Sequence, residues 1–204
     1  MRKEEMMLAD LVRKTRTVRR FQEEQPLASA LLRDLVDFAR LSGSARNGQV
    51  LKYRVITAKG LRQALFPLLG WAGYLPDWPG PALGERPPAY LACLLDTTLL
   101  RGTENEAYCD LGIATQSLLL GAAEQGVYGC RIGAFAHGPV HRLLQLEDHC
   151  KVLLLVALGY PAETVVLEEL GSEGAVRYWH DAQGVHHVPK RTLAQILIEP
   201  PEGV

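Results

Sequence analysis

The sequence lacks the marks of several large classes of protein. Its formal net charge is −1, whereas a protein that binds nucleic acid needs a clear basic excess. Apolar runs such as 152–158 are too short to cross a bilayer, and the first residues contain no uninterrupted apolar stretch of the kind found in a signal peptide. We therefore expect a cytoplasmic protein with no nucleic-acid or membrane partner. The four cysteines form no Cys-x-x-Cys pair and lie far apart: Cys93, Cys109, Cys130 and Cys150.

Motifs for metal or hydrolytic chemistry are also missing. The cysteine spacing fits neither a zinc ribbon nor a small disulfide scaffold. There is no Gly-x-Ser-x-Gly motif, and Ser117 falls inside a predicted helix, so a serine hydrolase is not indicated. His137 and His141 are four residues apart, but a proline separates them and no third ligand has matching spacing. His186 and His187 are adjacent in a predicted strand and would face opposite sides. We expect no metal site.

What is present is a globular pattern of helices and strands. The 204 residues, 48% of them hydrophobic, are enough for one domain spanning 1–204 with a substantial core. The order of the elements predicts an α+β fold with helices packed on a central sheet. Helical periodicity predicts helices over 4–14, from Pro26 through Ala39, and over 60–69, 106–125, 137–146 and 192–198. Strands are expected near 53–58, 89–95 and 151–158, with a hairpin over 177–188.

The segment 70–88 interrupts this pattern. It holds five prolines and four glycines, a composition that predicts a long irregular loop. Long loops in compact domains are usually functional or mobile. Its three large aromatic residues, Trp71, Tyr74 and Trp78, could stack on an aromatic substrate or simply cover a pocket.

Basic residues gather near both ends of the sequence. Arg16, Arg19 and Arg20 lie within five residues in a segment that we expect to be extended, which would place Arg16 and Arg20 on one side and Arg19 on the other. Arginine suits phosphate and planar oxygen acceptors, although a solvated basic loop would carry the same residues. Lys190 and Arg191 precede the last predicted helix, where cations oppose the helix dipole unless an anion also binds there.

Two further segments contain more special residues than a connection needs. SARNGQ, residues 44–49, joins a predicted helix to a predicted strand with four hydrogen-bonding side chains. The glycine-rich segment 126–133 follows a helix instead of a strand, so it does not fit a dinucleotide fingerprint. We interpret 126–133 as a turn in which the backbone approaches a neighbouring group closely.

Six of these segments, in the same order along the chain, resemble the motifs of the FMN-dependent nitroreductase family. The resemblance covers nearly the whole chain. The segments are Arg16-Thr17-Val18-Arg19-Arg20-Phe21, Ser44-Ala45-Arg46-Asn47-Gly48-Gln49 followed by Tyr53, Asp110-Leu111-Gly112-Ile113-Ala114-Thr115-Gln116-Ser117-Leu118, Gly129-Cys130-Arg131-Ile132-Gly133-Ala134-Phe135, Ala157-Leu158-Gly159-Tyr160-Pro161 and Arg191-Thr192-Leu193.

The resemblance implies a mainly antiparallel central sheet flanked by helices, in an intertwined homodimer with FMN at the subunit interface. Residues from several segments would hold the FMN. Arg16, Thr17 and Arg19 would contact the flavin, and Arg191, helped by Lys190, would hold its phosphate. Gly133 and Ala134 would present backbone N–H groups near the flavin N5, and Ser44 and Asn47 would reach the cofactor from the partner subunit. Within the same loop, we expect Gln49 to brace the backbone and Arg46 to be solvated.

The function implied is that of an FMN-dependent NAD(P)H oxidoreductase. The flavin would take a hydride from NADH or NADPH and pass electrons, in a ping-pong sequence, to a nitroaromatic, a quinone or a related electrophile. Such an enzyme needs no catalytic nucleophile of its own. Two alternatives stay open at this point: a protein that consumes or stores flavin without NAD(P)H turnover, and an interaction domain that binds no flavin.

Overall fold

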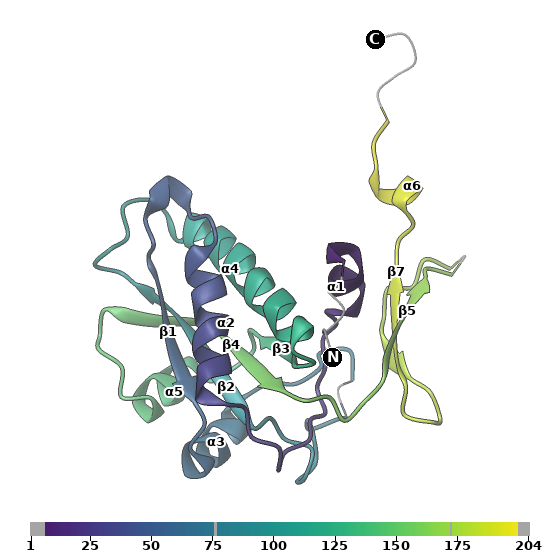
Figure 1. Cartoon of the computed structure of the whole chain (residues 1–204), viewed down its shortest axis with the longest axis horizontal. Coiled ribbons are helices and arrows are strands. Elements are labelled where there is room, and N and C mark those ends of the chain that lie inside the picture. Colours follow the sequence, from purple (N-terminus) through teal and green to yellow (C-terminus); the bar gives the residue numbers. More distant parts are fainter. Residues whose placement is uncertain (1–6, 76, 172, 200–204) are drawn as a thin grey trace, which may run out of the picture.

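The computed structural model of the chain is an α+β structure containing a larger and a smaller sheet (Figure 1). The structure describes residues 7–75, 77–171 and 173–199. The helices are α1 (Leu8–Lys14), α2 (Ser29–Leu41), α3 (Lys59–Leu65), α4 (Glu104–Glu124), α5 (His137–Leu143) and α6 (Leu193–Ile196), with short 3-10 turns η1 (Ala45–Asn47) and η2 (Phe66–Leu68). The strands are β1 (Leu51–Ile56), β2 (Ala89–Asp96), β3 (Tyr128–Ile132), β4 (Cys150–Gly159), β5 (Val165–Glu169), β6 (Trp179–His180) and β7 (His186–Lys190).

The larger sheet has the strand order β1-β2-β4-β3, and all its neighbouring strands are antiparallel. Helices α2 and α4 pack on one face, and α3 and α5 on the other (Figure 1). Because side chains alternate along a strand, Leu91 and Cys93 of β2 join the core beneath α4, while Tyr90 and Ala92 join the opposite core. This arrangement confirms the expected α+β sandwich with a mainly antiparallel sheet.

Helix α4 is the longest helix that the structure describes, and its start is fixed by a capping box. The Thr103 hydroxyl accepts a hydrogen bond from the Glu106 N–H at 3.3 Å, and the Thr103 N–H donates to the Glu106 carboxylate at 2.9 Å. The helix therefore begins two residues before the predicted position. Within the described residues, neither α4 nor any other helix is long and apolar enough to cross a membrane.

The smaller sheet stands beside the first and has the order β5-β7-β6 (Figure 1). β6 and β7 form the predicted hairpin, whose turn is held by Asp181: its carboxylate accepts hydrogen bonds from the N–H groups of Gln183 and Val185 at 2.9 and 2.8 Å. β5 pairs with β7 in parallel. The sequence analysis did not predict β5, a five-residue strand that is only partly buried.

The boundaries of the second and the last helix also differ from the sequence prediction. The second helix begins at Ser29, not at Pro26, because Ala28 before it is still extended and Leu27 is buried in the approach to the helix. The last helix covers only Leu193–Ile196. Thr192 caps it, so Lys190 belongs to strand β7 and not to the helix start.

The interpretation of 126–133 as a turn is wrong for most of its length. Only Gly126, with a φ of 71°, makes the turn after α4, and Tyr128–Ile132 form strand β3. The close backbone approach falls instead at Gly129. A side-chain Cβ there would lie 2.6 Å from the Ala157 carbonyl oxygen and 2.9 Å from Leu119, so this glycine lets β3 pack between β4 and α4.

Candidate functional site

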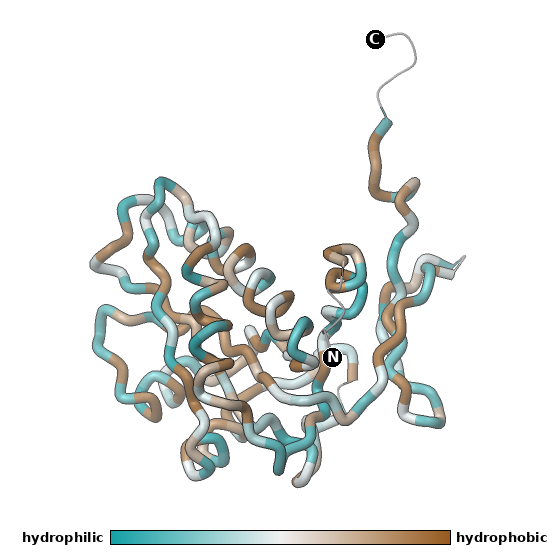
Figure 2. Tube along the Cα trace, in the orientation of Figure 1, coloured by the Kyte–Doolittle hydropathy of each residue, from teal (hydrophilic) through white to brown (hydrophobic). Residues whose placement is uncertain are grey.

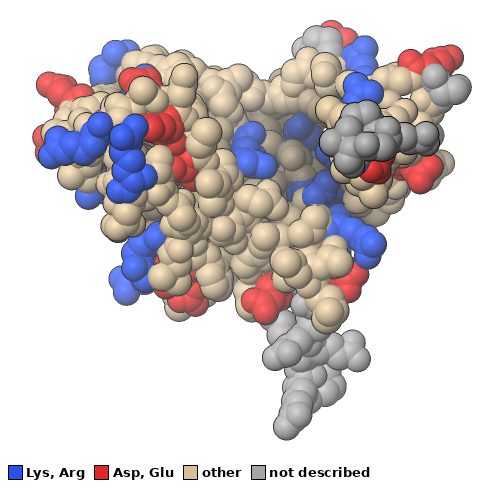
Figure 3. All heavy atoms as spheres, turned by 90° about the horizontal axis from the view of Figure 1, so that it is seen from above, with Lys and Arg blue, Asp and Glu red and all other residues tan. Residues whose placement is uncertain are grey.

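A basic cavity lies between α4, the segment after α1 and the smaller sheet. Its volume is about 370 Å³. Lys and Arg side chains gather in the hollow between the two parts of the molecule in Figure 3. Four cations and no acidic residue line the cavity among the described residues. The lining consists of Thr15, Arg16, Thr17, Arg19, Gln116, Leu119, Gly129, Arg131, Tyr178, His186, Val188 and Lys190.

The segment that carries Arg16 and Arg19 is anchored between these two arginines and after them. The Val18 N–H donates to the Gly129 carbonyl at 3.1 Å, and the side chains of Val18 and Phe21 are buried in the core. The segment touches the sheets only at isolated bridges, so it does not follow the regular alternation of a strand. Arg16 and Arg19 consequently face the same cavity, which contradicts the expectation that they point to opposite sides.

The two arginines have hydrogen-bonding capacity that the described residues do not use. Arg16 donates to the Val12 carbonyl at 2.8 Å, but its Nε is buried without a partner in the described chain. Burial lowers the pKa of Arg16 from its usual value. Arg19 is only 9% exposed, and its Nε and Nη1 likewise have no partner among the described residues. Buried N–H donors of this kind are costly unless they are satisfied, so the cavity suits an anion with several oxygen atoms.

Lys190 and Arg131 add two more cations, of which only Lys190 was predicted. Lys190, at the end of β7, lines the cavity, whereas its neighbour Arg191 does not; both residues are exposed. Arg131 comes from β3, and its Nη1 lies 3.3 Å from the Thr115 hydroxyl of α4. Arg131 lies inside the glycine-rich segment 126–133, which the sequence analysis interpreted as a turn. The alternation of side chains along a strand in that segment was the signal that could have identified Arg131 as a lining residue.

The hairpin contributes three lining residues that the sequence analysis missed: Tyr178, His186 and Val188. The Arg19 guanidinium carbon lies 4.6 Å from the centroid of the Tyr178 ring. Burial, followed by the nearby charge of Arg19, lowers the pKa of His186 to about 4. His186 is therefore a neutral imidazole at physiological pH.

The 44–49 loop forms part of a second, more apolar pocket that shares no lining residue with the basic cavity. Ser44 and Gln49 line this pocket, and Asn47 does not. The buried Asp110 of α4 holds the loop by accepting a hydrogen bond from the Ala45 N–H at 2.8 Å. The structure therefore does not bring Ser44 and Asn47 together with Arg16 and Arg19 within one chain.

Within the loop, side chains hold a strained backbone. Arg46, Asn47 and Gln49 have φ values of 55°, 52° and 48°, in the left-handed region that costs most residues energy. The Gln49 amide donates to the Asn47 carbonyl at 3.4 Å, and the Ser44 hydroxyl accepts from the Gln49 N–H at 3.3 Å, so Gln49 braces the loop as expected. The expectation that Arg46 is merely solvated is wrong, because it pairs with Glu106 at 2.8 Å.

Gly133 and Ala134 follow β3 and lie outside the lining of the basic cavity. The Ala134 carbonyl accepts a hydrogen bond from the Gly70 N–H at 2.7 Å, and a Cβ on Gly70 would lie 2.9 Å from that of Ala134. This contact fixes the start of the long 70–88 loop against the turn that follows β3.

The three aromatic residues of the 70–88 loop take different positions, and none of them lines the basic cavity. Trp71 is half-buried and packs against Phe66 and Trp78, with ring centroids 5.7 and 6.4 Å apart. Tyr74 is 47% exposed and packs on Tyr178 at 5.1 Å. The loop therefore reaches the cavity wall through Tyr74, while Trp71 serves the core.

Comparison with known proteins points to one family. A sequence-family model described as "Nitroreductase family" matches residues 97–160 of this chain. A nitroreductase family protein from Streptococcus pneumoniae TIGR4 is 20% identical with a TM-score of 0.64, over 78% of this chain and 92% of that one. A nitroreductase family protein from Clostridium novyi NT is 20% identical with a TM-score of 0.63, over 76% and 87%. An NADPH:FMN oxidoreductase from Vibrio harveyi, solved in complex with NAD+, is 21% identical with a TM-score of 0.59, over 76% and 68%.

Proposed function

Because this chain is nitroreductase-like, both in its fold and in segment 97–160, we propose that it is an FMN-dependent NAD(P)H oxidoreductase. The acceptor is a nitroaromatic, a quinone or a related electrophile. When bound, FMN supplies the redox chemistry: it takes a hydride from NADH or NADPH and then passes electrons to the acceptor in a ping-pong sequence. The chain's own residues bind and orient the reactants.

The observation that carries this proposal is the charge of the cavity. Arg16, Arg19, Arg131 and Lys190 line one hollow in a protein whose formal net charge is −1. Arg19 is buried and Arg16 half-buried, while Arg131 and Lys190 are exposed. Cations gathered in one hollow whose described lining holds no acidic residue repel one another, and a bound anion relieves that repulsion. The unpartnered N–H groups of Arg16 and Arg19 fit the phosphate and the carbonyl oxygens of FMN.

Residues in the cavity and around it then have separate tasks. Lys190 holds the phosphate, and Arg191, outside this cavity, contributes less. Arg16, Thr17 and Arg19 bind the flavin, where Arg19 stabilises the negative charge that develops near N1 and the C2 carbonyl on reduction. Gly133 and Ala134 offer backbone N–H groups near N5, as the family resemblance implies.

We include a homodimer in the proposal, because each chain holds the two expected halves of the site in separate pockets. Ser44 and Asn47 would then reach the flavin held by the partner. The C-terminal segment supports this view: it extends away from the rest of the molecule and carries apolar residues (Figures 1 and 2). These residues are largely exposed: Leu193 at 70%, Ile196 at 62%, Leu197 at 51% and Ile198 at 93%.

The test is the absorbance spectrum of the purified protein under anaerobic conditions, before and after each nicotinamide is added. We expect a yellow protein whose flavin bands bleach with NADH or NADPH and return when the acceptor is added. A colourless protein that FMN does not reconstitute would contradict the proposal. A yellow protein that neither nicotinamide reduces would instead identify a flavin-binding protein without turnover.

Substitution of the cavity arginines sharpens this test. Arg16→Ala combined with Arg19→Ala should weaken FMN binding by about 100-fold or more, because each charge-assisted hydrogen bond contributes about 1.5–3 kcal/mol. Arg33→Ala is the matched control, since Arg33 is exposed on α2 far from the lining residues. Equal FMN affinity in the double variant and the control would rule out the cavity as the site.

A further inference from the structure

Two histidines of the β6–β7 hairpin lie side by side. His180 of β6 is the direct cross-strand partner of His186 of β7, and directly opposed residues point to the same face of a sheet. Their ring centroids are 4.8 Å apart. His187 points to the other face, where its ring nitrogens meet the carboxylates of Glu168 and Asp181.

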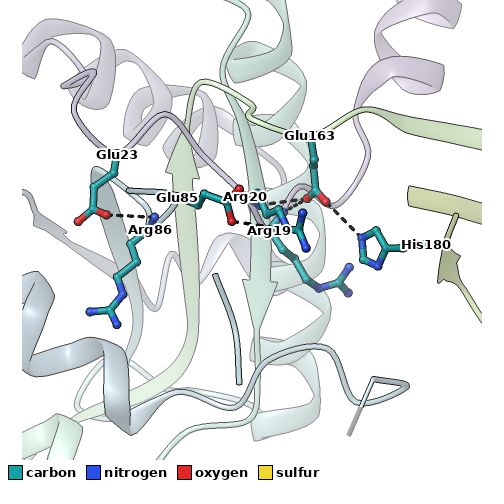
Figure 4. A network of polar contacts seen from close by, with 7 residues as sticks. All are labelled: Arg19, Arg20, Glu23, Glu85, Arg86, Glu163 and His180. Carbon is teal, nitrogen blue, oxygen red and sulfur yellow. Dashed lines mark hydrogen bonds and ion pairs between the residues drawn. The ribbon is translucent and has the colours of Figure 1, made fainter. Parts of the chain in front are cut away.

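Glu163, in the connection between β4 and β5, approaches the same pair. Its side chain is 2% exposed. One carboxylate oxygen, Oε1, accepts hydrogen bonds from the backbone N–H groups of Arg19 and Arg20. The other oxygen, Oε2, faces His180 Nε2 at 3.5 Å (Figure 4). The backbone N–H groups thus fix the carboxylate through its first oxygen, and its second oxygen is directed at the histidines.

His186 is the most buried of the three and has no polar partner. It is 1% exposed, and neither ring nitrogen has a hydrogen-bond partner among the described residues. Its ring contacts Tyr178 and His180 instead. A buried imidazole with two unsatisfied nitrogens costs free energy, and a bound ion at one nitrogen would remove part of that cost.

We propose that Glu163, His180 and His186 form a binding site for a divalent transition-metal ion of the zinc type. The three ligand atoms lie within 4.8 Å of one another. Ligand atoms around tetrahedral zinc are roughly 3.3 Å apart. Glu163 Oε2 and His180 Nε2, at 3.5 Å, are already close to that spacing, and the most widely separated pair must close by at most about 1.5 Å. Two imidazoles and one carboxylate suit zinc and its neighbours in the first transition row, whereas calcium and magnesium require mainly oxygen ligands.

The surroundings provide access and set the charge. An open pocket lined by Arg20, Glu163 and the hairpin turn lies beside the cluster, and His186 borders the basic cavity. The fourth coordination position is left for water or another small ligand, as in catalytic zinc sites. The positive charge of Arg19 opposes a cation here, and the negative charge of the Glu163 carboxylate opposes that effect.

The experiment is a titration of untagged, chelator-treated protein with Co²⁺, followed by visible absorbance, and with Zn²⁺, followed by calorimetry. We expect one equivalent of Co²⁺ per chain, with the visible bands of a four- or five-coordinate ion that Zn²⁺ displaces. Glu163→Gln preserves an oxygen to accept the two backbone N–H groups and removes the ligand oxygen. Glu163→Gln and His180→Gln should each weaken binding at least tenfold.

His187→Gln is the matched control, because His187 is the neighbour of His186 on the opposite face, and it should leave the affinity unchanged. Since the buried His186 could be essential for folding, the conclusion depends on the Glu163 and His180 variants. The proposal is overturned if the wild type binds no equivalent of Co²⁺ or Zn²⁺, or if both variants bind as the wild type does. It is also overturned if binding disappears only when His137 and His141 are both changed to Gln.

Discussion

The Arg19 guanidinium lies over the ring of Tyr178, with 4.6 Å between the guanidinium carbon and the ring centroid. This contact joins the arginine-rich segment near the beginning of the chain to the hairpin near its end. A buried cation over an aromatic face is stabilised by the ring's quadrupole, by up to about 2 kcal/mol. Tyr178 therefore orients one of the donors of the basic cavity without being charged itself.

The first prediction concerns this contact. Tyr178→Ala should weaken FMN binding by about 2- to 30-fold, since the loss of a cation–π contact of about 0.5–2 kcal/mol frees the Arg19 side chain. Tyr178→Phe keeps the aromatic face and should stay within about threefold of the wild type. Fluorescence titration of the apoprotein with FMN measures both. Trp179→Ala, on the face that stacks against His187, serves as the control.

The second prediction separates two neighbouring cations. Lys190 lines the basic cavity and Arg191 does not, so Lys190→Ala should weaken FMN binding about tenfold and Arg191→Ala by clearly less. Raising the salt concentration should reduce the affinity of the wild type more than that of the Lys190 variant, because screening acts on the charge that the variant lacks. If Arg191→Ala has the larger effect, the assignment of the phosphate to Lys190 is wrong.

The third prediction tests the close packing of β3. Gly129→Ala should lower the free energy of unfolding by about 2 kcal/mol or more, because the new methyl group would lie 2.6 Å from the Ala157 carbonyl. Gly60→Ala provides the comparison: it adds a methyl group to α3 where nothing lies within 4 Å, and should be neutral or stabilising by up to about 1 kcal/mol. Urea denaturation monitored by circular dichroism gives both values.

The fourth prediction concerns the buried thiols. Burial raises the pKa of Cys93 to about 12 and that of Cys130 to about 11, so neither should react with a thiol reagent in the native protein at pH 8, where only the thiolate is nucleophilic. In denaturant all four cysteines should react, including the exposed Cys109. Peptide mass spectrometry after timed alkylation identifies the sites.

The same pKa shifts predict a fall in stability at alkaline pH. The folded state favours the protonated thiols, so their contribution is fully present below the usual thiol pKa of about 9 and is lost as the pH rises toward 11 or 12. Cys93→Ala should flatten the loss of stability between pH 9 and 11. An unchanged pH profile in this variant would show that other groups control the alkaline transition.

The sequence was sufficient for the fold class and for the residues whose role is local. Apolar runs identified the buried strands β2 and β4, and periodicity identified α4 to within two residues. The short, half-exposed strand β5 was not predicted because its five residues lack a strong apolar pattern. Arg16 and Arg19 were assigned to opposite sides because a regular strand was assumed, whereas the segment has only isolated bridges.

Residues that meet only through the tertiary structure could not be predicted in the same way. Arg131, Tyr178 and His186 reach the basic cavity from β3 and from the hairpin, which are far apart in sequence. Glu163 and His180 likewise meet only because β5 and β6 flank β7. No spacing rule in one sequence reveals such neighbours, because their proximity depends on the order of strands in the smaller sheet.

The origin of the cavity's charge has a consequence for biosynthesis. Arg16 leaves the ribosome long before Lys190. The wall formed by the hairpin and β7 does not exist until residues 178–190 have emerged, after every strand of the larger sheet, so a nascent chain can fold much of the larger sheet while this hollow is still open on one side. Any anion that depends on Lys190 is therefore acquired only after that residue has emerged, by a protein whose larger sheet can already have formed.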